Sequence, residues 1–144
     1  MTQIFKSKVD YNKLKSKEKE SYNFHKFAST LAEYGYDCER LFNDSEGADF
    51  IAISNDHKKI IKLQNKSTNI GLSKKYMGKD IYIIFRSSDY LYCFPHDELI
   101  EWIPNNNLNY LNTKSWQKKG IYNITDTTNK KLMKYLKNYR IKIS

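Results

Sequence analysis

The sequence predicts a mixed α/β domain in which a central sheet of about five strands is flanked by helices. An amphipathic helix is indicated by apolar residues spaced at i, i+3, i+4 and i+7, namely Phe24, Phe27, Ala28 and Leu31. Two apolar, β-branched runs at 48–54 and 59–64 surround the turn residues of 55–58 and predict a pair of adjacent strands. A second pair of such runs, at 80–85 and 90–94, predicts another hairpin.

The N-terminal part of the chain consists of an arm and a helix. Residues 1–12 have no periodicity and are expected to form a loosely held arm, and the helical pattern runs from Leu14 to about Tyr34. Glu20 lies at the edge of the apolar stripe, whereas Glu18 points to the opposite side. An acid at this edge is costly to bury unless something pairs with it. Glu20 is therefore either paired or, alternatively, a solvated first-turn glutamate that the helix dipole favours.

A short strand is predicted at 36–41, and the polar residues of 43–47 are typical of a turn. Arg40 in this strand is available either to a phosphate or, as an ordinary surface pair, to Glu39 and Asp44. The apolar run that follows the turn is typical of a strand covered on both faces.

Three polar residues lie at the ends of the two central strands. Asp49 opens the first strand, and Gln64 and Lys66 close the second. Because successive side chains of a strand point to opposite faces, Gln64 and Lys66 share a face. These residues predict a divalent-cation site with a lysine beside it. The alternative is that Asp49 is an entry-turn residue that only satisfies backbone amides.

The least regular internal stretch is 65–79, which has no convincing helical period. Within it, Lys74, Lys75 and Tyr76 put two cations beside an aromatic ring. This combination suits contact with a phosphate or a substrate, although charged loop residues are usually only solvated.

The C-terminal third is expected to contain two helices. Asp97 is expected to cap a short helix that runs through Trp102, after Pro95 has ended the second hairpin. His96, directly before this cap, is interpreted as a hydrogen-bonded structural residue, with catalysis as the alternative. The segment 116–120 is expected to cover the sheet edge. A basic C-terminal helix is predicted around Leu132, Met133, Leu136 and Tyr139, with Lys130, Lys131, Lys134, Lys137 and Arg140.

Composition indicates one soluble domain with an anionic partner. The chain has 144 residues, enough for one domain with a buried core, and a net charge of +9. Such a charge favours a polyanion, because neutralised phosphates release counterions, although a Lys- and Asn-rich sequence from an AT-rich genome is the alternative. No apolar run reaches the length of a membrane span, so a cytoplasmic location is expected. Cys38 and Cys93 belong to no motif and are expected to be reduced thiols.

Taken together, these residues resemble the PD-(D/E)XK nuclease superfamily, which includes many restriction enzymes, some homing endonucleases and the archaeal Holliday-junction resolvases. The resemblance rests on Asp49 followed, about one strand-turn-strand later, by Gln64-x-Lys66. It covers most of the chain, from about Leu14 to Trp102, and implies a restriction-endonuclease-like core. The runs 22–26, 47–52, 62–64 and 74–80 also look like a family of small bacterial proteins of that type.

The resemblance implies a nuclease that uses Mg²⁺ or Mn²⁺ to hydrolyse phosphodiester bonds in DNA. Asp49, Gln64 and Glu20 would hold the cation, and Lys66 would stabilise charge on the phosphate. Gln64 stands where the motif usually has Asp or Glu. Its amide oxygen still suits a hard cation but brings no negative charge, so metal affinity should fall. The expected nucleic-acid contacts are Lys74, Lys75, Tyr76 and Arg40.

Two other function classes stay open. One is a catalytically inactive nucleic-acid-binding module on the same scaffold, and the other is a protein-interaction domain with Trp102, Trp116 and the tyrosines as its contact surface. A single small domain that cuts both strands needs two sites, so a homodimer or homotetramer is expected.

Overall fold

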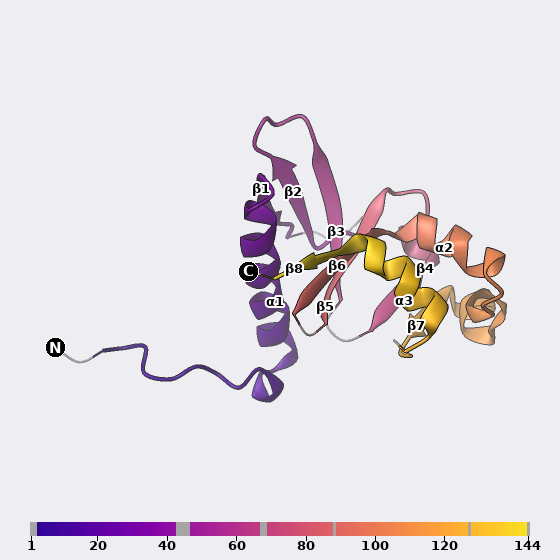
Figure 1. Ribbon diagram of the computed structural model, residues 1–144, viewed down its shortest axis with the longest axis horizontal. Coiled ribbons are helices and arrows are strands. Elements are labelled where there is room, and N and C mark those ends of the chain that lie inside the picture. The colour runs from indigo at the N-terminus through magenta and orange to yellow at the C-terminus, as the bar shows by residue number, and fades with distance from the viewer. Residues whose placement is uncertain (1–2, 43–46, 67–68, 88, 127, 144) are drawn as a thin grey trace.

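The computed structural model of the chain describes residues 3–42, 47–66, 69–87, 89–126 and 128–143. Figure 1 shows a central sheet with helices on both of its faces and a second, smaller sheet beside it. The strands are β1 (Tyr36–Arg40), β2 (Phe50–Ser54), β3 (Ile60–Lys66), β4 (Ile70–Ser73), β5 (Ile81–Ser87), β6 (Tyr90–Pro95), β7 (Ile121–Ile124) and β8 (Arg140–Lys142). The helices are α1 (Ser16–Ala32), α2 (His96–Asn105) and α3 (Lys130–Leu136), with short turns η1 (Tyr11–Lys13), η2 (Lys74–Tyr76), η3 (Tyr110–Asn112), η4 (Ser115–Lys119) and η5 (Lys137–Tyr139).

The central sheet is mixed and has the strand order β1-β2-β3-β5-β6-β8. Only β3 and β5 pair in parallel within the described residues, and every other neighbouring pair in this sheet is antiparallel. The prediction of a mixed α/β domain with a central sheet flanked by helices is confirmed, with six strands in place of about five. Both predicted hairpins, β2–β3 and β5–β6, are present.

Helix α1 covers one face of the sheet. Its apolar stripe packs on Phe50, whose ring lies 5.1 Å from the ring of Phe24 and 6.5 Å from that of Phe27. Leu63 of β3 is buried in the same cluster. Complete burial of such a side chain stabilises the fold by about 1.5–3 kcal/mol, so these contacts fix α1 on the sheet.

The opposite face of the sheet carries the larger core. Ile83 and Phe94 point to this side and pack with residues of α2, α3 and the small sheet formed by β4 and β7. Phe85 and Tyr92, directly opposite each other on β5 and β6, stack with their ring centroids 5.0 Å apart. Trp116 of η4 is also buried in this core, at 5% exposure.

Two parts of the fold differ from the sequence prediction. The stretch 65–79, predicted to be irregular, contains β4, which pairs with the unpredicted strand β7. The C-terminal helix ends at Leu136, so Arg140 lies in β8 opposite Tyr92 and not in a helix. The strand forms because Ile141 and Ile143, two residues apart, both reach the core on the α1 side of the sheet.

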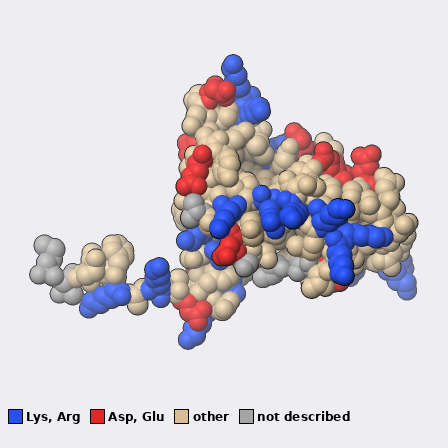
Figure 2. Space-filling model, in the orientation of Figure 1, with Lys and Arg blue, Asp and Glu red and all other residues tan. Residues whose placement is uncertain are grey.

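Outside the body of the protein, residues 3–10 extend as an arm (Figure 1), and Phe5 in this arm is 86% exposed. Figure 2 shows Lys and Arg side chains gathered over α3 and β8. The exposed cations of these elements and η5 are Lys130, Lys131, Lys134, Lys137, Arg140 and Lys142. In the part of the chain that the structure describes, no helix is both long and apolar enough to cross a membrane.

Candidate active site

The start of β2 and the end of β3 lie side by side at one end of the sheet. The backbone N–H of Asp49 donates to the carbonyl oxygen of Leu63 at 2.8 Å, directly beyond the pair formed by Phe50 and Leu63. Asp49 is the residue directly before β2, and this bond holds it beside Leu63. Gln64 and Lys66 share one face of β3, beside Ile83 and Phe85 of β5, in the core on the side opposite α1.

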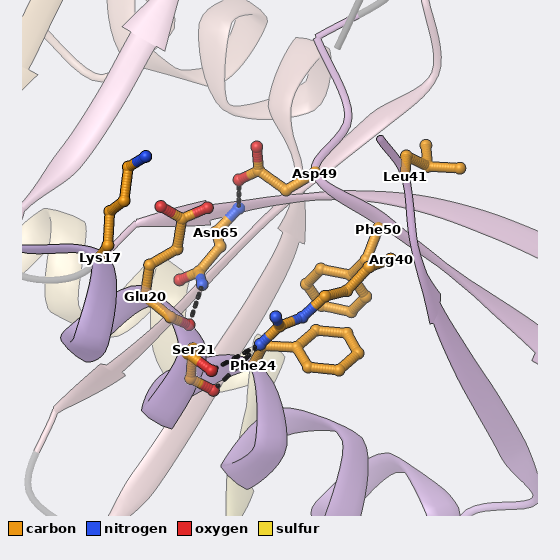
Figure 3. Close-up of a pocket in the computed structure, with 9 residues that line it drawn as sticks. All are labelled: Lys17, Glu20, Ser21, Phe24, Arg40, Leu41, Asp49, Phe50 and Asn65. Carbon is orange, nitrogen blue, oxygen red and sulfur yellow. Dashed lines mark hydrogen bonds between the residues drawn. The ribbon is translucent and has the colours of Figure 1, made fainter. Parts of the chain in front are cut away.

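The carboxylate of Asp49 is held by the neighbouring strand. Its Oδ2 accepts a hydrogen bond from the backbone N–H of Asn65 at 2.8 Å. The side-chain amide of Asn65 donates in turn to the carbonyl oxygen of Glu20 at 3.3 Å, as Figure 3 shows. Asn65 therefore connects Asp49 to helix α1. Sequence reasoning missed this residue, although its place between Gln64 and Lys66 turns its side chain toward the α1 face.

Two adjoining hollows open at this end of the sheet. The larger has a volume of about 320 Å³ and is lined by Lys17, Glu20, Ser21, Phe24, Arg40, Leu41, Asp49, Phe50 and Asn65. Figure 3 shows the carboxylates of Glu20 and Asp49 close to Asn65 in this hollow. The smaller hollow, of about 180 Å³, is lined by Ser16, Glu20, Asp49, Gln64 and Asn65. The two acids and the amide that the sequence singled out therefore share one site.

Gln64 has an unusual environment. Its side chain is buried, at 9% exposure, and its Oε1 has no hydrogen-bond partner among the described residues. Most buried polar atoms in native proteins are hydrogen-bonded, and an unpaired one costs about 1–3 kcal/mol. An amide oxygen without a hydrogen-bond partner is able to coordinate a hard cation.

The two glutamates of α1 have different positions. Glu18 belongs to the first turn, where its Oε1 accepts from the backbone N–H of Lys15 at 2.8 Å and caps the helix. Glu20 reaches the hollows that Asp49 lines. The choice of Glu20 over Glu18 agrees with these positions, while its role as a cation ligand stays a prediction.

Lys66 lies on the same face as Gln64, but its ammonium group points elsewhere. Its Nζ donates to the hydroxyl of Tyr76 at 3.1 Å and lies 5.4 Å from the centre of that ring. Lys66 lines neither of the two hollows. Among the described residues, no carboxylate lies within ion-pair distance of it, so its charge is paired only with a neutral hydroxyl.

Tyr76 lies in the core and contacts both Lys66 and the segment that precedes Asp49. Its exposure is 8%, and a Cβ on Gly47 would lie only 2.8 Å from its Cδ1. Gly47 has a φ of +87°, which favours glycine, and it comes two residues before Asp49. Tyr76 therefore packs against the segment that carries Asp49 while it holds Lys66. Burial of Tyr76 argues against its expected contact with nucleic acid.

The other predicted nucleic-acid contacts lie in different places. Arg40 lines the larger hollow, where its guanidinium lies 4.4 Å from the centre of the Phe24 ring and donates to Ser21 Oγ at 2.9 Å. Lys75 is exposed. The ammonium of Lys74 lies over the Trp116 ring at 5.5 Å. The structure brings only Arg40 of these cations to the hollow with the acids.

His96 uses both ring nitrogens inside the fold. Its Nε2 accepts from the backbone N–H of Ser73 at 3.1 Å, so Nδ1 carries the proton that is shared with Asp97 Oδ1 at 2.9 Å. Burial lowers the pKa of His96, and nearby Lys66 acts in the same direction, while Asp97 opposes the shift. These contacts agree with the structural interpretation of His96.

The predicted capping role of Asp97 is wrong, because α2 begins at His96 with Pro95 at its N-cap position. The Asp97 carboxylate instead joins His96 to Gly78, whose N–H donates to Oδ2 at 2.8 Å.

The remaining residues weighed from the sequence do not join the site. Asp44, the possible partner of Arg40, lies outside the described residues. His57 is exposed at the tip of the β2–β3 hairpin, with a φ of +60°. Cys38 and Cys93 are free thiols, and burial raises their pKa values to about 11 and about 12. Both therefore stay protonated near neutral pH and are poor nucleophiles.

The residues at the hollows fit a hard divalent cation. Across the described ranges, no three His, Cys, Asp or Glu side chains are grouped closely enough to hold a metal ion. The smaller hollow is bordered by two acidic residues, Glu20 and Asp49, and by Gln64, whose side chain also carries an oxygen. An all-oxygen set of this kind suits Mg²⁺ or Mn²⁺ better than softer metals.

Comparison with known proteins gives one partial likeness. No protein-family model matches the chain, and no curated protein matches it. Among solved structures, a bacterial homing endonuclease, I-Ssp6803I, aligns with 60% of this chain and 69% of its own chain, at 15% sequence identity and a TM-score of 0.44. This degree of similarity does not assign the chain to a family.

The unpaired oxygen of Gln64 leads to a stability prediction. In metal-free buffer, Gln64→Met removes the unsatisfied acceptor with little change in volume, so we expect the free energy of unfolding to rise by about 1 kcal/mol. Asn23 provides a contrast, because its Oδ1 is also buried and unpaired while its Nδ2 donates to Tyr11. Asn23→Leu should therefore lower stability. Urea unfolding measures both, and a loss of stability in Gln64→Met would contradict the expectation.

The neutral state of His96 leads to a pH prediction. Because its pKa is lowered in the folded state from an ordinary value of 6.5, the unfolded chain binds the proton more readily. Stability should therefore be complete above pH 6.5 and decrease below it, by at most about 1.4 kcal/mol per pH unit. We expect His96→Asn to have a lower free energy of unfolding than wild type at pH 7.5. Between pH 7 and 5 its free energy of unfolding should change less with pH than that of wild type. The exposed-site control His25→Asn should keep the wild-type profile, and a wild-type profile in His96→Asn would refute the assignment.

Proposed function

We propose that this protein is a metal-dependent nuclease that hydrolyses phosphodiester bonds in DNA. The observation that carries the proposal is a hollow that Glu20, Asp49 and Gln64 line together. The net charge of +9 supports a polyanionic substrate, because a basic surface attracts phosphates. Acidic residues grouped within such a surface would bind a cation, which could then bind a phosphate of the substrate. The resemblance to the PD-(D/E)XK superfamily leads to the same proposal.

In this proposal, Asp49, Glu20 and Gln64 hold the divalent cation. When bound, such a cation polarises a phosphoryl oxygen and lowers the pKa of a water molecule. The chain contributes the positions of the donors. The hydrogen bond from the Asn65 amide fixes the Asp49 carboxylate before any ligand arrives, which reduces the conformational entropy lost on binding.

Lys66 is proposed to stabilise the negative charge that develops on the phosphate oxygens. Its ammonium is held by the neutral hydroxyl of Tyr76 at 3.1 Å, and within the described residues no carboxylate neutralises it. A cation whose charge is still available can interact with an anionic substrate without first breaking an ion pair. Tyr76 would then act as a positioning residue for Lys66.

A second candidate is a nucleic-acid-binding module without catalysis. Two observations favour it: Gln64 brings no negative charge to the cation site, and the ammonium of Lys66 is directed at Tyr76 and lines neither hollow. Such a module would bind DNA through its basic surface and leave it intact.

Assembly and location follow from the same proposal. Cutting both strands with one small domain requires two copies of the site, so we propose a symmetric homodimer or homotetramer. The two free thiols, Cys38 and Cys93, fit a reducing compartment such as the cytoplasm.

The direct test is cleavage of plasmid and of labelled duplex DNA with Mg²⁺, Mn²⁺ or EDTA. We expect cleavage only with metal, and at least about a 100-fold loss of rate in Lys66→Met, which removes transition-state charge stabilisation. Lys58→Gln, at the far end of the β2–β3 hairpin, is the charge-matched control and should keep full activity. Salt-sensitive binding without cleavage would select the second candidate. If the protein neither binds nor cleaves DNA, the remaining function class is a protein-interaction domain.

Metal binding can be tested without DNA. A cation that binds only the folded state raises the melting temperature, by a free energy of about 2.7 kcal/mol at 100 times the Kd. We expect Mn²⁺ to raise the melting temperature of the wild type but not of Asp49→Ala. Glu18→Ala removes an acid from the same helix that supplies Glu20 and should retain the shift. An equal shift in wild type and Asp49→Ala would exclude this metal site.

A further inference from the structure

Arg86 lies at the end of β5, against two tyrosine rings. Its guanidinium carbon is 5.2 Å from the centre of the Tyr11 ring and 5.3 Å from the centre of the Tyr22 ring. The two rings are 5.2 Å apart and tilted by 55°, so the guanidinium and the two ring centres form a nearly equilateral triangle in which the guanidinium contacts both rings. Contact with two ring faces restricts a side chain that would otherwise be mobile on the surface.

The Tyr11 ring is held in place by a buried side chain of α1. The hydroxyl of Tyr11 accepts from the side-chain amide of Asn23 at 2.9 Å, and Asn23 is only 1% exposed. Tyr11 belongs to η1, before α1, and Tyr22 belongs to α1 itself. Two elements of the chain therefore cooperate to hold one guanidinium.

This cluster carries positive charge without a neutralising acid. The ammonium of Lys19 lies 5.5 Å from the centre of the Tyr11 ring, and that of Lys26 lies 5.5 Å from the centre of the Tyr22 ring. In the ranges that the structure describes, no carboxylate lies within ion-pair distance of Arg86 or of either lysine. Three like charges held around two rings repel each other, so an anion that binds beside them would reduce this repulsion.

The cluster lies on the flank of α1 opposite Arg40. Both arginines belong to the sheet face that α1 covers: Arg40 contacts Phe24 and Ser21, and Arg86 contacts Tyr22. Their strands, β1 and β5, are three neighbours apart in the order β1-β2-β3-β5, about 14 Å at ~4.8 Å per strand. The candidate active site lies on the strands between them, where β2 begins and β3 ends.

We propose that Arg86, with Lys19 and Lys26, binds backbone phosphates of the nucleic acid on the side of α1 opposite Arg40. This inference rests on the proposed function for the identity of the anion. A guanidinium presents a planar fork that matches a phosphate with two hydrogen bonds, which an ammonium does not. Because the rings already restrict Arg86, little side-chain entropy remains to be lost on binding.

A rival surface for the same polyanion is the basic band over α3 and β8 (Figure 2). Helix α3 packs on the sheet face opposite α1, in the other core cluster. Its lysines Lys130, Lys131 and Lys134 are exposed along a helix of only two turns. The two surfaces are on different faces of the sheet, so their contributions can be separated by mutation.

The test measures the salt dependence of DNA binding in EDTA, where metal-dependent hydrolysis cannot occur. The affinity for a fluorescein-labelled 20-base-pair duplex is measured by anisotropy between 50 and 200 mM NaCl. Each phosphate contact contributes about 0.9 to the slope of log K against log salt. Arg86→Gln should reduce the slope by about this amount, so that its loss of affinity across the range is about 3-fold smaller than that of wild type.

Two further variants make the result specific. Arg86→Lys keeps the charge but not the fork, so it should keep the slope and bind more weakly. Lys58→Gln removes one charge at the opposite end of the sheet and should leave slope and affinity unchanged. If Arg86→Gln does not fold, weaker binding by Arg86→Lys at unchanged slope still tests the proposal.

Three outcomes would overturn the inference: a wild-type slope in Arg86→Gln, a reduced slope in Lys134→Gln but not in Arg86→Gln, or no binding by the wild type. These outcomes differ from failure of the nuclease proposal. A protein that binds DNA with an Arg86-dependent slope but never cuts it with Mg²⁺ or Mn²⁺ supports the phosphate contact and refutes the nuclease. If the wild type cleaves DNA and the slope is unchanged in Arg86→Gln, the nuclease proposal is supported and the phosphate contact is refuted.

Discussion

The antiparallel register between β2 and β3 is the constraint on which the site depends. Because Phe50 faces Leu63, Asp49 lies beside the end of β3, where its carboxylate accepts a hydrogen bond from the backbone amide of Asn65. The apolar cluster under α1 fixes this register, since a slip of one residue would turn Leu63 out of the core and Gln64 into it. The position of a few polar atoms is therefore determined by the packing of apolar side chains behind them.

The same end of the sheet combines well-satisfied groups with one that is not. The Asp49 carboxylate, the Asn65 amide and both nitrogens of His96 have hydrogen-bond partners, whereas Gln64 Oε1 has none in the described structure. A buried acceptor without a partner has a local cost in stability, and Asn23 Oδ1 and Tyr135 Oη are in the same position elsewhere in the described chain. This cost is consistent with a binding site, where stability is commonly exchanged for function.

Local patterns were sufficient for the larger elements and for the shared face of Gln64 and Lys66. The spacing of Phe24, Phe27 and Leu31 gave α1, and strand alternation placed Gln64 and Lys66 on one face. The short strands β4 and β7 could not be found in the same way, because four residues hold little periodicity and each strand is defined by its distant partner.

The direction in which a long side chain points was also outside the reach of sequence patterns. Lys66 reaches Tyr76, and Arg86 lies against two adjacent rings from η1 and α1, because of contacts that only the folded chain creates. Tyr76 followed two lysines in the sequence and was therefore interpreted as a surface residue. Its burial depends on Gly47, which leaves space for the ring.

The link between Asn65 and α1 has a consequence for how the pocket opens and closes. Asp49 and Asn65 are 16 residues apart and are joined by a local hairpin, whereas Glu20 and Asn65 are 45 residues apart and meet only when α1 docks. Native proteins open in cooperative segments whose free energies differ. Transient undocking of α1 would withdraw the Glu20 carboxylate while the hairpin stays intact, so hydrogen exchange in α1 would report the lifetime of the complete pocket separately from that of the sheet.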